Sequence, residues 1–395
     1  MDWRNINSYS DLEKIYPKHI LDKFPIPDRG YYKNVPDTDW YNWKWQLQNR
    51  ITSLEELEKI VTVTPDERRS FTECAKKFKM AITPYYATLM DRYDPKCPIR
   101  KECVPYFEEM NILATDLEDP LSEERDSPVP GLTHRYPDRV LFYVSHDCPL
   151  LCRHCTRKRK VSKPDSAAQG DRLEKGFEYI QNHPEVRDIV VSGGDPCCLG
   201  SDRLGYILKR LREIPHVEIV RLGTRTPVTL PMRWRDDSIL EEIEKVGPIH
   251  LNTHFNHPRA MTRENLLAVT RIHLAGVAMG NQTVLLKNVN DDAKIMMEVC
   301  HKLLLMKIRP YYIYQCDLAE GIGHFRTKVS KGVEIIRQMR GWTSGLAIPQ
   351  FVVDAPGGGG KIPMNPNYIE SYEGNKLVLK NYKGMICSYY EPEEK

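Results

Sequence analysis

The segment RVLFYVSHDCPLLCRHCTRKRK, residues 139–160, joins an apolar, strand-like run to three closely spaced cysteines. Residues 139–145 are rich in β-branched and aromatic side chains, which is typical of a buried strand. The loop that follows carries Cys148, Cys152 and Cys155 in a Cys-x3-Cys-x2-Cys arrangement. Three thiolates leave one iron of a 4Fe–4S cluster open, whereas a zinc site would need a remote fourth ligand. The spacing favours the open cluster, with zinc as the alternative.

Further runs of the same strand-like type follow, and helical patterns separate them. These runs are residues 188–193, 217–224, 250–255, 281–286, 309–315 and 349–354. Apolar strands that alternate with helices are typical of parallel βα units. We therefore expect an α/β fold, a partial (βα)6-type barrel, with a doubly wound open sheet as the alternative. In a barrel the chemistry takes place at the C-terminal ends of the strands, so site residues are expected in the loops that follow them.

The pattern of the sequence changes at SPVPGLTHRYP, residues 127–137. Before this segment the helical period dominates, and its prolines and glycine mark a boundary. We expect a helical N-terminal region over residues 1–130, the barrel over 131–362 and a short C-terminal extension over 363–395.

The 395 residues include 57 Lys and Arg and 54 Asp and Glu, which gives a net charge of +3. So small a charge provides no general electrostatic reason to bind nucleic acid or anionic lipid. With 41% apolar and 28% charged residues, the composition excludes the disordered and collagen-like classes. The N-terminus has no signal or transit pattern, no apolar stretch is long enough to span a bilayer, and the eleven cysteines are an odd number. We expect a cytoplasmic protein with reduced thiols and without nucleic acid or membrane as a partner.

A glycine-rich segment, FVVDAPGGGGKIP at residues 351–363, contains the end of the last expected strand. A phosphate-binding P-loop would need glycine and Ser or Thr where Ala355 and Ile362 stand, so that interpretation fails. A lysine on a glycine-rich turn can instead form a Schiff base with pyridoxal phosphate (PLP). Lys361 is therefore a candidate for cofactor attachment.

Several motifs together resemble the lysine 2,3-aminomutase family of radical S-adenosylmethionine (SAM) enzymes. They are HRYPDR, CRHCTR, LNTHFNHP, RPYYIYQCDL, HFRT and FVVDAPGGGGK, and the likeness runs from about residue 37 to the end. The resemblance implies a 4Fe–4S cluster, SAM and PLP as cofactors. It also implies an isomerase that moves an α-amino group to the β-carbon through a PLP aldimine and a 5′-deoxyadenosyl radical.

The resemblance assigns cofactor contacts to the matching positions. The cluster would be held by Cys148, Cys152 and Cys155. In SGGDP, which can also make an ordinary turn, Ser192 or Asp195 would accept a hydrogen bond from the SAM amine. By their places in the sequence, His154 between the cysteines and His254 and Gln282 at strand ends are further candidates for SAM contacts, with a satisfied structural polar group as the alternative for each. The PLP contacts would be Lys361 as internal aldimine and catalytic lysine, Arg135 and Arg139 at the phosphate, and Tyr136 and Tyr314 at the ring.

Substrate contacts follow from the same resemblance. Arg157 matches the residue that binds the substrate α-carboxylate, and Asp317 and Asp354 match the two carboxylates that receive a cationic side chain. Two carboxylates in one partly buried pocket repel each other unless a cation lies between them, so a basic substrate fits. Glutamate-specific relatives replace these acids. L-Lysine is therefore the first choice, arginine the second and ornithine the third.

The resemblance also implies an external electron donor of flavodoxin or ferredoxin type and a homodimer or homotetramer. The family's Cys-rich zinc tail is not matched: the last cysteine is Cys387, and Asp292 stands where a partner cysteine would fall, so we expect no zinc. Two other functions stay open. One is a β-lysine-forming enzyme that acts for protein modification. The other is a non-catalytic iron–sulfur protein, in which the GGGGK segment and the two aspartates would have no purpose.

Overall fold

The computed structural model describes residues 2–74, 77–161 and 163–392, and a curved sheet lies at its centre. In this part of the chain the sheet has nine strands, which neighbour one another in chain order from β1 to β9. The strands are β1 Leu132–Tyr136, β2 Arg139–Ser145, β3 Asp188–Gly193, β4 Ile219–Gly223, β5 His250–Thr253, β6 Ala278–Leu285, β7 Arg309–Gln315, β8 Gln350–Ala355 and β9 Gly360–Pro363.

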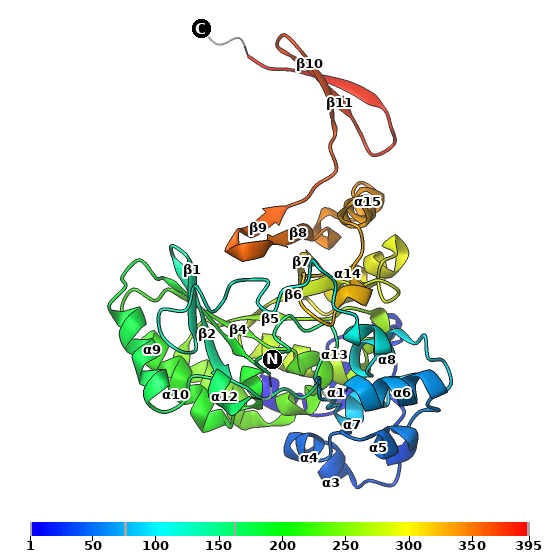
Figure 1. Ribbon diagram of the computed structural model, residues 1–395, viewed down its shortest axis with the longest axis vertical. Coiled ribbons are helices and arrows are strands. Elements are labelled where there is room, and N and C mark those ends of the chain that lie inside the picture. Colours follow the sequence, from blue (N-terminus) through cyan, green and yellow to red (C-terminus); the bar gives the residue numbers. More distant parts are fainter. Residues whose placement is uncertain (1, 75–76, 162, 393–395) are drawn as a thin grey trace.

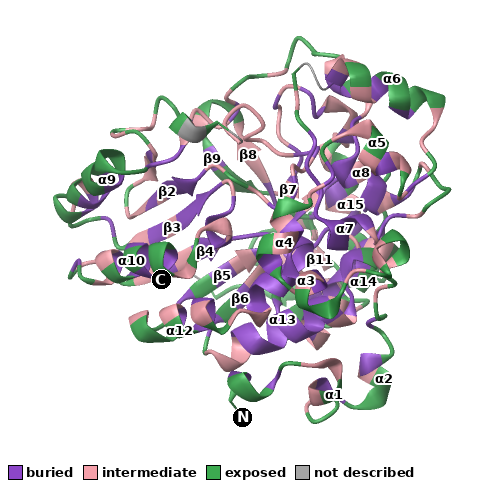
Figure 2. Ribbon diagram, turned by 90° about the horizontal axis from the view of Figure 1, so that it is seen from below, coloured by how far each residue is buried: buried purple, intermediate pink, exposed green. Residues whose placement is uncertain are grey.

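Strands β2 to β8 are parallel to their neighbours, and helices connect them. The connecting helices are α9 Asp171–Gln181, α10 Ser201–Arg212, α11 Thr226–Thr229, α12 Asp237–Val246, α13 Arg263–Leu274, α14 Ala293–Leu305 and α15 Val329–Met339. They cover the outer side of the curved sheet (Figures 1 and 2). A doubly wound sheet reverses its strand order at a switch point, and this sheet does not. The predicted partial (βα)6-type barrel is therefore confirmed.

The sheet stays open between its first and last strands. β1 is antiparallel to β2, and β9 is antiparallel to β8. All seven expected strand-like runs are strands: β2, β3 and β7 have the expected bounds, and the others differ by a few residues. The two edge strands were not predicted, because β1 buries only Leu132 and β9 only Gly360, so neither has an apolar pattern.

The N-terminal part contains short helices that are joined by irregular segments. They are α1 Tyr9–Leu12, α2 Lys18–Leu21, α3 Asp37–Trp40, α4 Trp43–Gln48, α5 Leu54–Glu58, α6 Pro65–Cys74, α7 Pro84–Ala87 and α8 Pro98–Cys103. Their buried side chains belong to the same hydrophobic core as those of the barrel. For example, the Tyr85 hydroxyl lies 2.8 Å from Thr262 Oγ1 and donates to Asn265 Oδ1 at 2.8 Å, which fixes α7 against α13. The N-terminal helices are thus packed on the barrel as one body.

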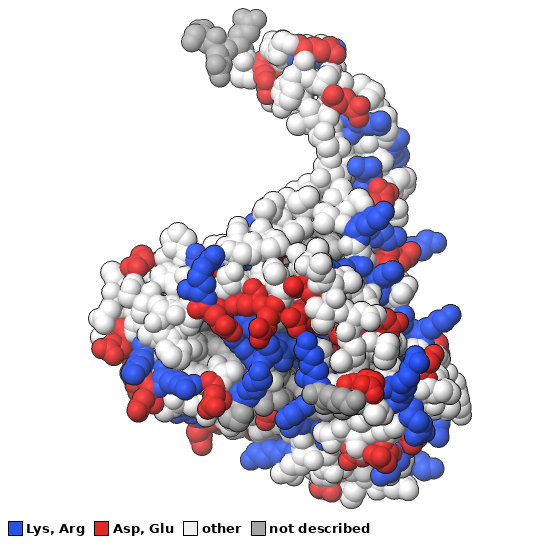
Figure 3. Space-filling model, viewed as in Figure 1, with Lys and Arg blue, Asp and Glu red and all other residues white. Residues whose placement is uncertain are grey.

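The last described residues form a separate antiparallel sheet of β10 Ile369–Glu373, β11 Lys376–Lys380 and β12 Ile386–Tyr390. This sheet rises from the body as an arm, and acidic and basic side chains gather on the face beneath it (Figures 1 and 3). The expected region boundaries at 130/131 and 362/363 stay predictions, and residues 1, 75–76, 162 and 393–395 within those regions lie outside the described residues. Among the described residues, no helix has the length and apolar content needed to cross a membrane.

Candidate active site

A cavity of about 660 Å³ lies at the carboxyl ends of the parallel strands. Every residue to which the sequence analysis gave a cofactor or substrate contact lines this cavity. These are Cys148, Cys152, His154, Cys155, Arg157, Ser192, Asp195, His254, Gln282, Arg135, Tyr136, Arg139, Tyr314, Asp317, Asp354 and Lys361. The strand ends bring them together because parallel strands present their carboxyl ends at one edge. Their individual roles stay predictions.

The cysteine loop after β2 is held by backbone hydrogen bonds from N-terminal segments. Leu151 N donates to Ala81 O at 2.9 Å, and Arg153 N donates to Glu102 O at 2.9 Å. All three cysteines are free thiols that line the cavity. Among the described residues, no three His, Cys, Asp or Glu side chains converge on a single metal ion. A 4Fe–4S cluster places each thiolate on a different iron, so three separated thiols on one loop suit a cluster.

The glycines after β3 let its end pack directly on the start of this loop. Gly193 has φ +137°, and a Cβ there would lie 2.3 Å from Ser145 O. A Cβ on Gly194 would lie 2.4 Å from Asp147 O, while its amide donates to Ser145 O at 2.6 Å. A side chain at either position would push the cysteine loop away.

The Asp195 carboxylate ties the end of β4 to the end of β3. It accepts hydrogen bonds from Thr224 Oγ1 at 2.6 Å, from Cys197 N at 3.0 Å and from Arg225 N at 2.7 Å. Burial raises the pKa of Asp195 to about 6, although these hydrogen bonds oppose the shift. Because both oxygens already have protein donors, Asp195 has a structural role, and its contact with SAM stays a prediction.

The two cavity histidines are neutral. Burial and the nearby Arg225 lower the pKa of His254 to about 4, and the same causes lower the pKa of His154. His154 Nδ1 is buried and has no hydrogen-bond partner among the described residues. An unpaired polar atom in a cavity wall suits a site for a polar ligand such as SAM.

Lys361 lies at the antiparallel edge of the sheet, where β9 turns back along β8. Its amine contacts both oxygens of Asp354, at 3.1 and 3.2 Å, and lies 5.3 Å from the centre of the Tyr314 ring. Its backbone N donates to Tyr136 Oη at 3.2 Å. The side chains of Lys361, Asp354, Tyr314 and Tyr136 thus lie together at one wall of the cavity.

The two arginines of the HRYPDR motif differ in how they are engaged. Arg135 Nε donates to Asp126 at 3.1 Å, and another nitrogen of its guanidinium donates to Leu121 O. Arg139 lies over the Tyr136 ring at 4.1 Å, and its contact with Asp138 is long, at 3.8 Å. Arg139 therefore has more donors available for an anion than Arg135.

Asp317 follows β7 and contributes the second carboxylate. Its Oδ2 accepts a hydrogen bond from Thr156 Oγ1 at 2.7 Å, and it makes no ion pair with any described residue. Burial raises the pKa of Asp317 to about 6, the charge of Asp354 adds to this effect, and the Thr156 hydrogen bond opposes it. Of these two aspartates, Asp354 is paired with a lysine and Asp317 has no ion-pair partner among the described residues, although Lys361 and Arg157 are near enough to oppose the rise of its pKa.

Arg157 forms an ion pair with a carboxylate that was not predicted from the sequence. Its Nε and Nη2 contact Glu123 Oε1 at 2.8 and 2.7 Å. Burial alone would raise the pKa of Glu123, but Arg157 and two further cations lower it to about 2. Arg157 therefore reaches the cavity as one half of an ion pair.

Two family models match the chain. The model for the radical SAM superfamily matches residues 142–298, and the model described as lysine-2,3-aminomutase matches residues 336–395. The chain is also 51% identical to the L-lysine 2,3-aminomutase of Clostridium subterminale. The alignment spans 361 residues, which are 91% of the chain and 86% of that protein. The chain belongs to the lysine 2,3-aminomutase family. The predicted family membership is confirmed.

Other relatives agree with this assignment. The L-lysine 2,3-aminomutase of Bacillus subtilis is 50% identical over 92% of the chain and 77% of that protein. The glutamate 2,3-aminomutase of Clostridioides difficile is 42% identical over 89% of the chain and 83% of that protein. The protein is thus a radical SAM aminomutase, an isomerase that acts on an amino acid, and the family implies a 4Fe–4S cluster, SAM and PLP. This excludes the non-catalytic iron–sulfur protein.

Three side chains in or beside the cavity were missed by the sequence analysis. Arg225 directly follows the run 217–224, so its place at a strand end was a usable signal. Thr156 stands between Cys155, the last of the predicted cluster cysteines, and Arg157, in a loop that was already expected to line the site. Glu123 gave no signal, because it lies in an irregular segment before the barrel and reaches Arg157 only in the folded protein.

Proposed function

We propose that the protein moves the α-amino group of a basic amino acid, preferably L-lysine, to the β-carbon. The observation that carries the proposal is the Asp317 carboxylate, which makes no ion pair with a described residue and lies in the same cavity as the Asp354–Lys361 pair. A side-chain ammonium or guanidinium would pair with this carboxylate and offset both the burial that raises the pKa of Asp317 and the smaller repulsion from Asp354. A glutamate side chain would add a third carboxylate to the same wall.

The cofactors would be held by the lining residues. PLP would be held by Lys361, Arg135, Arg139, Tyr136 and Tyr314, SAM by Ser192, Asp195, His154, His254 and Gln282, and the cluster by Cys148, Cys152 and Cys155. When bound, the cluster and SAM supply the radical that removes a hydrogen atom, and PLP supplies a ring that stabilises the substrate radical.

The protein's own contribution is placement of the substrate. Arg157 offers a planar pair of donors to the α-carboxylate, for which Glu123 holds the guanidinium in place. Asp317 and Asp354 hold the far end of a basic side chain. A substrate bound at both ends presents one β-hydrogen to the radical and is shielded from water by the cavity walls.

A second cavity lysine competes for the role of the catalytic lysine. Burial lowers the pKa of Lys158 to about 8, so a larger fraction of its amine is neutral. Its Nζ is, however, fixed by Glu109 Oε2 at 2.8 Å and Gly321 O at 3.0 Å, and it lies over the Phe78 ring at 4.4 Å. Among the described residues, the amine of Lys361 forms hydrogen bonds only with Asp354 and lies farther from its aromatic neighbour, 5.3 Å from the centre of the Tyr314 ring, so Lys361 is the better candidate.

The test is anaerobic reconstitution with iron, sulfide, reductant, SAM and PLP, followed by a comparison of lysine, arginine, ornithine and glutamate. We expect β-amino product fastest from lysine, and fastest turnover of glutamate would refute the argument from Asp317. Borohydride reduction of the PLP-loaded protein should label Lys361 in the native chain and in Lys158→Met. Lys361→Ala should lose the label and all turnover but keep its iron content. A label on Lys158 would overturn the lysine assignment.

The partners that we propose are an external one-electron donor of flavodoxin or ferredoxin type and a second copy of the chain. The C-terminal arm supports a homodimer or homotetramer, because Tyr372, Ile386 and Tyr389 are exposed on its strands. Sedimentation of the reconstituted protein tests this, and a monomer would refute it. The alternative, a β-lysine-forming enzyme that acts for protein modification, would carry out the same reaction, but its product would then be attached to a protein.

A further inference from the structure

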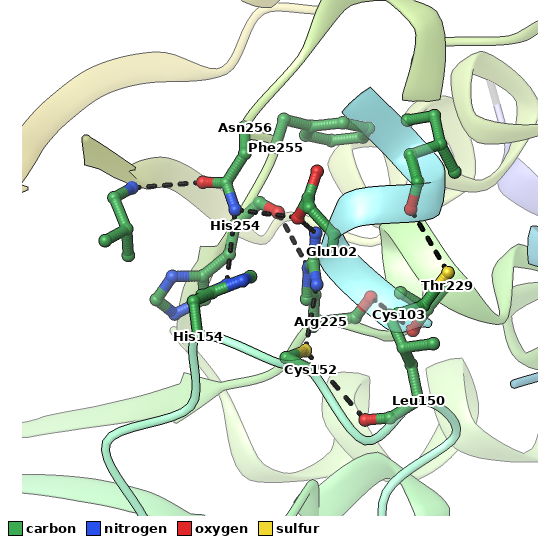
Figure 4. Close-up of polar contacts among 12 residues, drawn as sticks. Glu102, Cys103, Leu150, Cys152, His154, Arg225, Thr229, His254, Phe255 and Asn256 are labelled. Carbon is green, nitrogen blue, oxygen red and sulfur yellow. Dashed lines mark hydrogen bonds and ion pairs between the residues drawn. The ribbon is translucent and has the colours of Figure 1, made fainter. Parts of the chain in front are cut away.

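A buried guanidinium lies between a predicted cluster cysteine and a buried carboxylate. Arg225 Nη1 donates to Cys152 Sγ at 2.8 Å, and Arg225 Nη2 forms an ion pair with Glu102 Oε2 (Figure 4). The Glu102 side chain is fully buried, and that of Arg225 is 10% exposed. This pair has no part in holding the substrate in the proposed function.

Arg225 is fixed from several sides. Its Nε donates to His254 O at 3.1 Å, and its backbone N donates to Asp195 at 2.7 Å. Glu102 is fixed in turn, since Asn256 Nδ2 donates to its Oε2 at 2.9 Å. Glu102 lies on α8 of the N-terminal region, and its backbone oxygen also accepts from Arg153 N in the cysteine loop. One N-terminal residue therefore contacts both the loop that carries Cys152 and the cation that contacts its sulfur.

We propose that Arg225 raises the reduction potential of the cluster by donating to the Cys152 thiolate, and that Glu102 limits this effect by neutralising part of the guanidinium charge. The inference rests on the proposed function only for the presence of the cluster. A hydrogen bond to a ligating sulfur and a nearby positive charge both stabilise the reduced cluster, which is more negative than the oxidised one. In the step concerned, one electron enters the cluster from the reductant, and no bond forms or breaks in Arg225 or Glu102.

Two changes at this pair have opposite expected effects. Glu102→Gln removes the counter-charge but keeps an amide oxygen for Arg225, so the cluster becomes easier to reduce. Arg225→Gln in the Glu102→Gln background removes the guanidinium without leaving a buried carboxylate unpaired, so the cluster becomes harder to reduce than in the single variant. A purely structural role would not reverse the direction in this way.

The matched control is another buried Arg–Glu pair that reaches α8. Arg100 Nε and Nη2 donate to Glu67 Oε1 and Oε2 at 2.6 Å each, and neither residue lines the cavity. Glu67→Gln therefore removes a comparable buried charge without a contact to a cluster cysteine.

The experiment is an anaerobic titration of the reconstituted proteins with dithionite in the absence of SAM, PLP and substrate, read by electron paramagnetic resonance. At a fixed potential we expect at least a tenfold rise in the ratio of reduced to oxidised cluster in Glu102→Gln, which is about 59 mV for one electron. Adding Arg225→Gln should lower that ratio at least tenfold. Glu67→Gln should match the native chain.

Equal potentials in all four proteins would overturn the inference. The inference would also be overturned if both substitutions shifted the reduction potential in the same direction, or if the Glu102→Gln protein and the double variant both lost iron. Either result would mean that the pair only helps the cysteine loop to fold. The readout needs no turnover. A native chain that binds the cluster and shows the two opposite shifts but forms no β-amino acid would refute the proposed function and leave the inference standing.

Discussion

Replacing Asp317 with asparagine should stabilise the substrate-free protein while it weakens the binding of a basic amino acid. The Asp317 carboxylate is largely buried, accepts one hydrogen bond from Thr156 and has no cation among its described partners, so its pKa is raised from 3.8 to about 6. A pKa difference of this size means that the ionised carboxylate destabilises the folded state by about 3 kcal/mol at neutral pH. Asparagine keeps the shape and the acceptor for Thr156 but has no charge to bury.

The pH dependence gives this prediction its sign. A group with a raised folded-state pKa contributes stability at low pH and loses that contribution as the pH rises through the folded value. The gain from Asp317→Asn should therefore grow from about 1.5 kcal/mol at pH 5 to about 3 kcal/mol at pH 8. Urea unfolding at both pH values, on protein freed of cluster, SAM and PLP, measures the gain without coupling to ligand release.

Two results would refute the reasoning about Asp317. One is a gain that does not change with pH, and the other is a variant that is less stable than the native chain at pH 8. Thr156→Val provides the complementary test, because it removes the hydrogen bond that opposes the pKa shift. The pKa of Asp317 should then exceed its native value of about 6. As the pH is lowered, Asp317 should therefore take up its proton earlier, and KM for lysine should start to increase at a higher pH than in the native enzyme. An unchanged KM profile would contradict this.

Further predictions concern the parts that position the site. Glu123→Gln leaves Arg157 without its charged partner, so we expect KM for lysine to change at least several-fold while the iron content stays native; unchanged kinetics would contradict a positioning role. Gly193→Ala places a Cβ 2.3 Å from Ser145 O at a positive φ, so we expect iron binding to fall well below the native level, whereas Gly200→Ala, with nothing within 4 Å, should bind iron normally. Equal iron contents in the two variants would show that the cysteine loop tolerates the displacement.

The barrel and its cavity lining could be predicted because both follow from local patterns. The parallel strands are short runs of β-forming residues that alternate with helical patterns, and residues at successive strand ends must meet at one edge. The arm could not be predicted in the same way. Strands β10 to β12 bury little, and residues such as Tyr372 and Ile386 are exposed, so no buried face imposes a pattern on the sequence.

The two carboxylates that pair with Arg225 and Arg157 were not predicted, for a common physical reason. Glu102 and Glu123 belong to the N-terminal region, and their partners Arg225 and Arg157 lie more than thirty residues further along the chain. A carboxylate in an ordinary helix or loop looks like a solvated charge until packing buries it against a specific cation. The sequence could therefore reveal the arginine that follows a strand but not the acid that fixes it.

The charged residues of the cavity indicate how it would discriminate between a basic and an acidic substrate side chain. Arg157 pairs with Glu123 and Lys361 pairs with Asp354, whereas Asp317 makes no ion pair with a described residue. A relative named glutamate 2,3-aminomutase is 42% identical over 89% of the chain. Asp317→Asn alone should weaken lysine binding without creating glutamate activity, because Asp354 still repels a side-chain carboxylate once Lys361 is engaged elsewhere. Glutamate turnover should require the loss of both acids. If the single variant converted glutamate, Asp354 would have no part in discrimination, and the two-carboxylate argument would reduce to one residue.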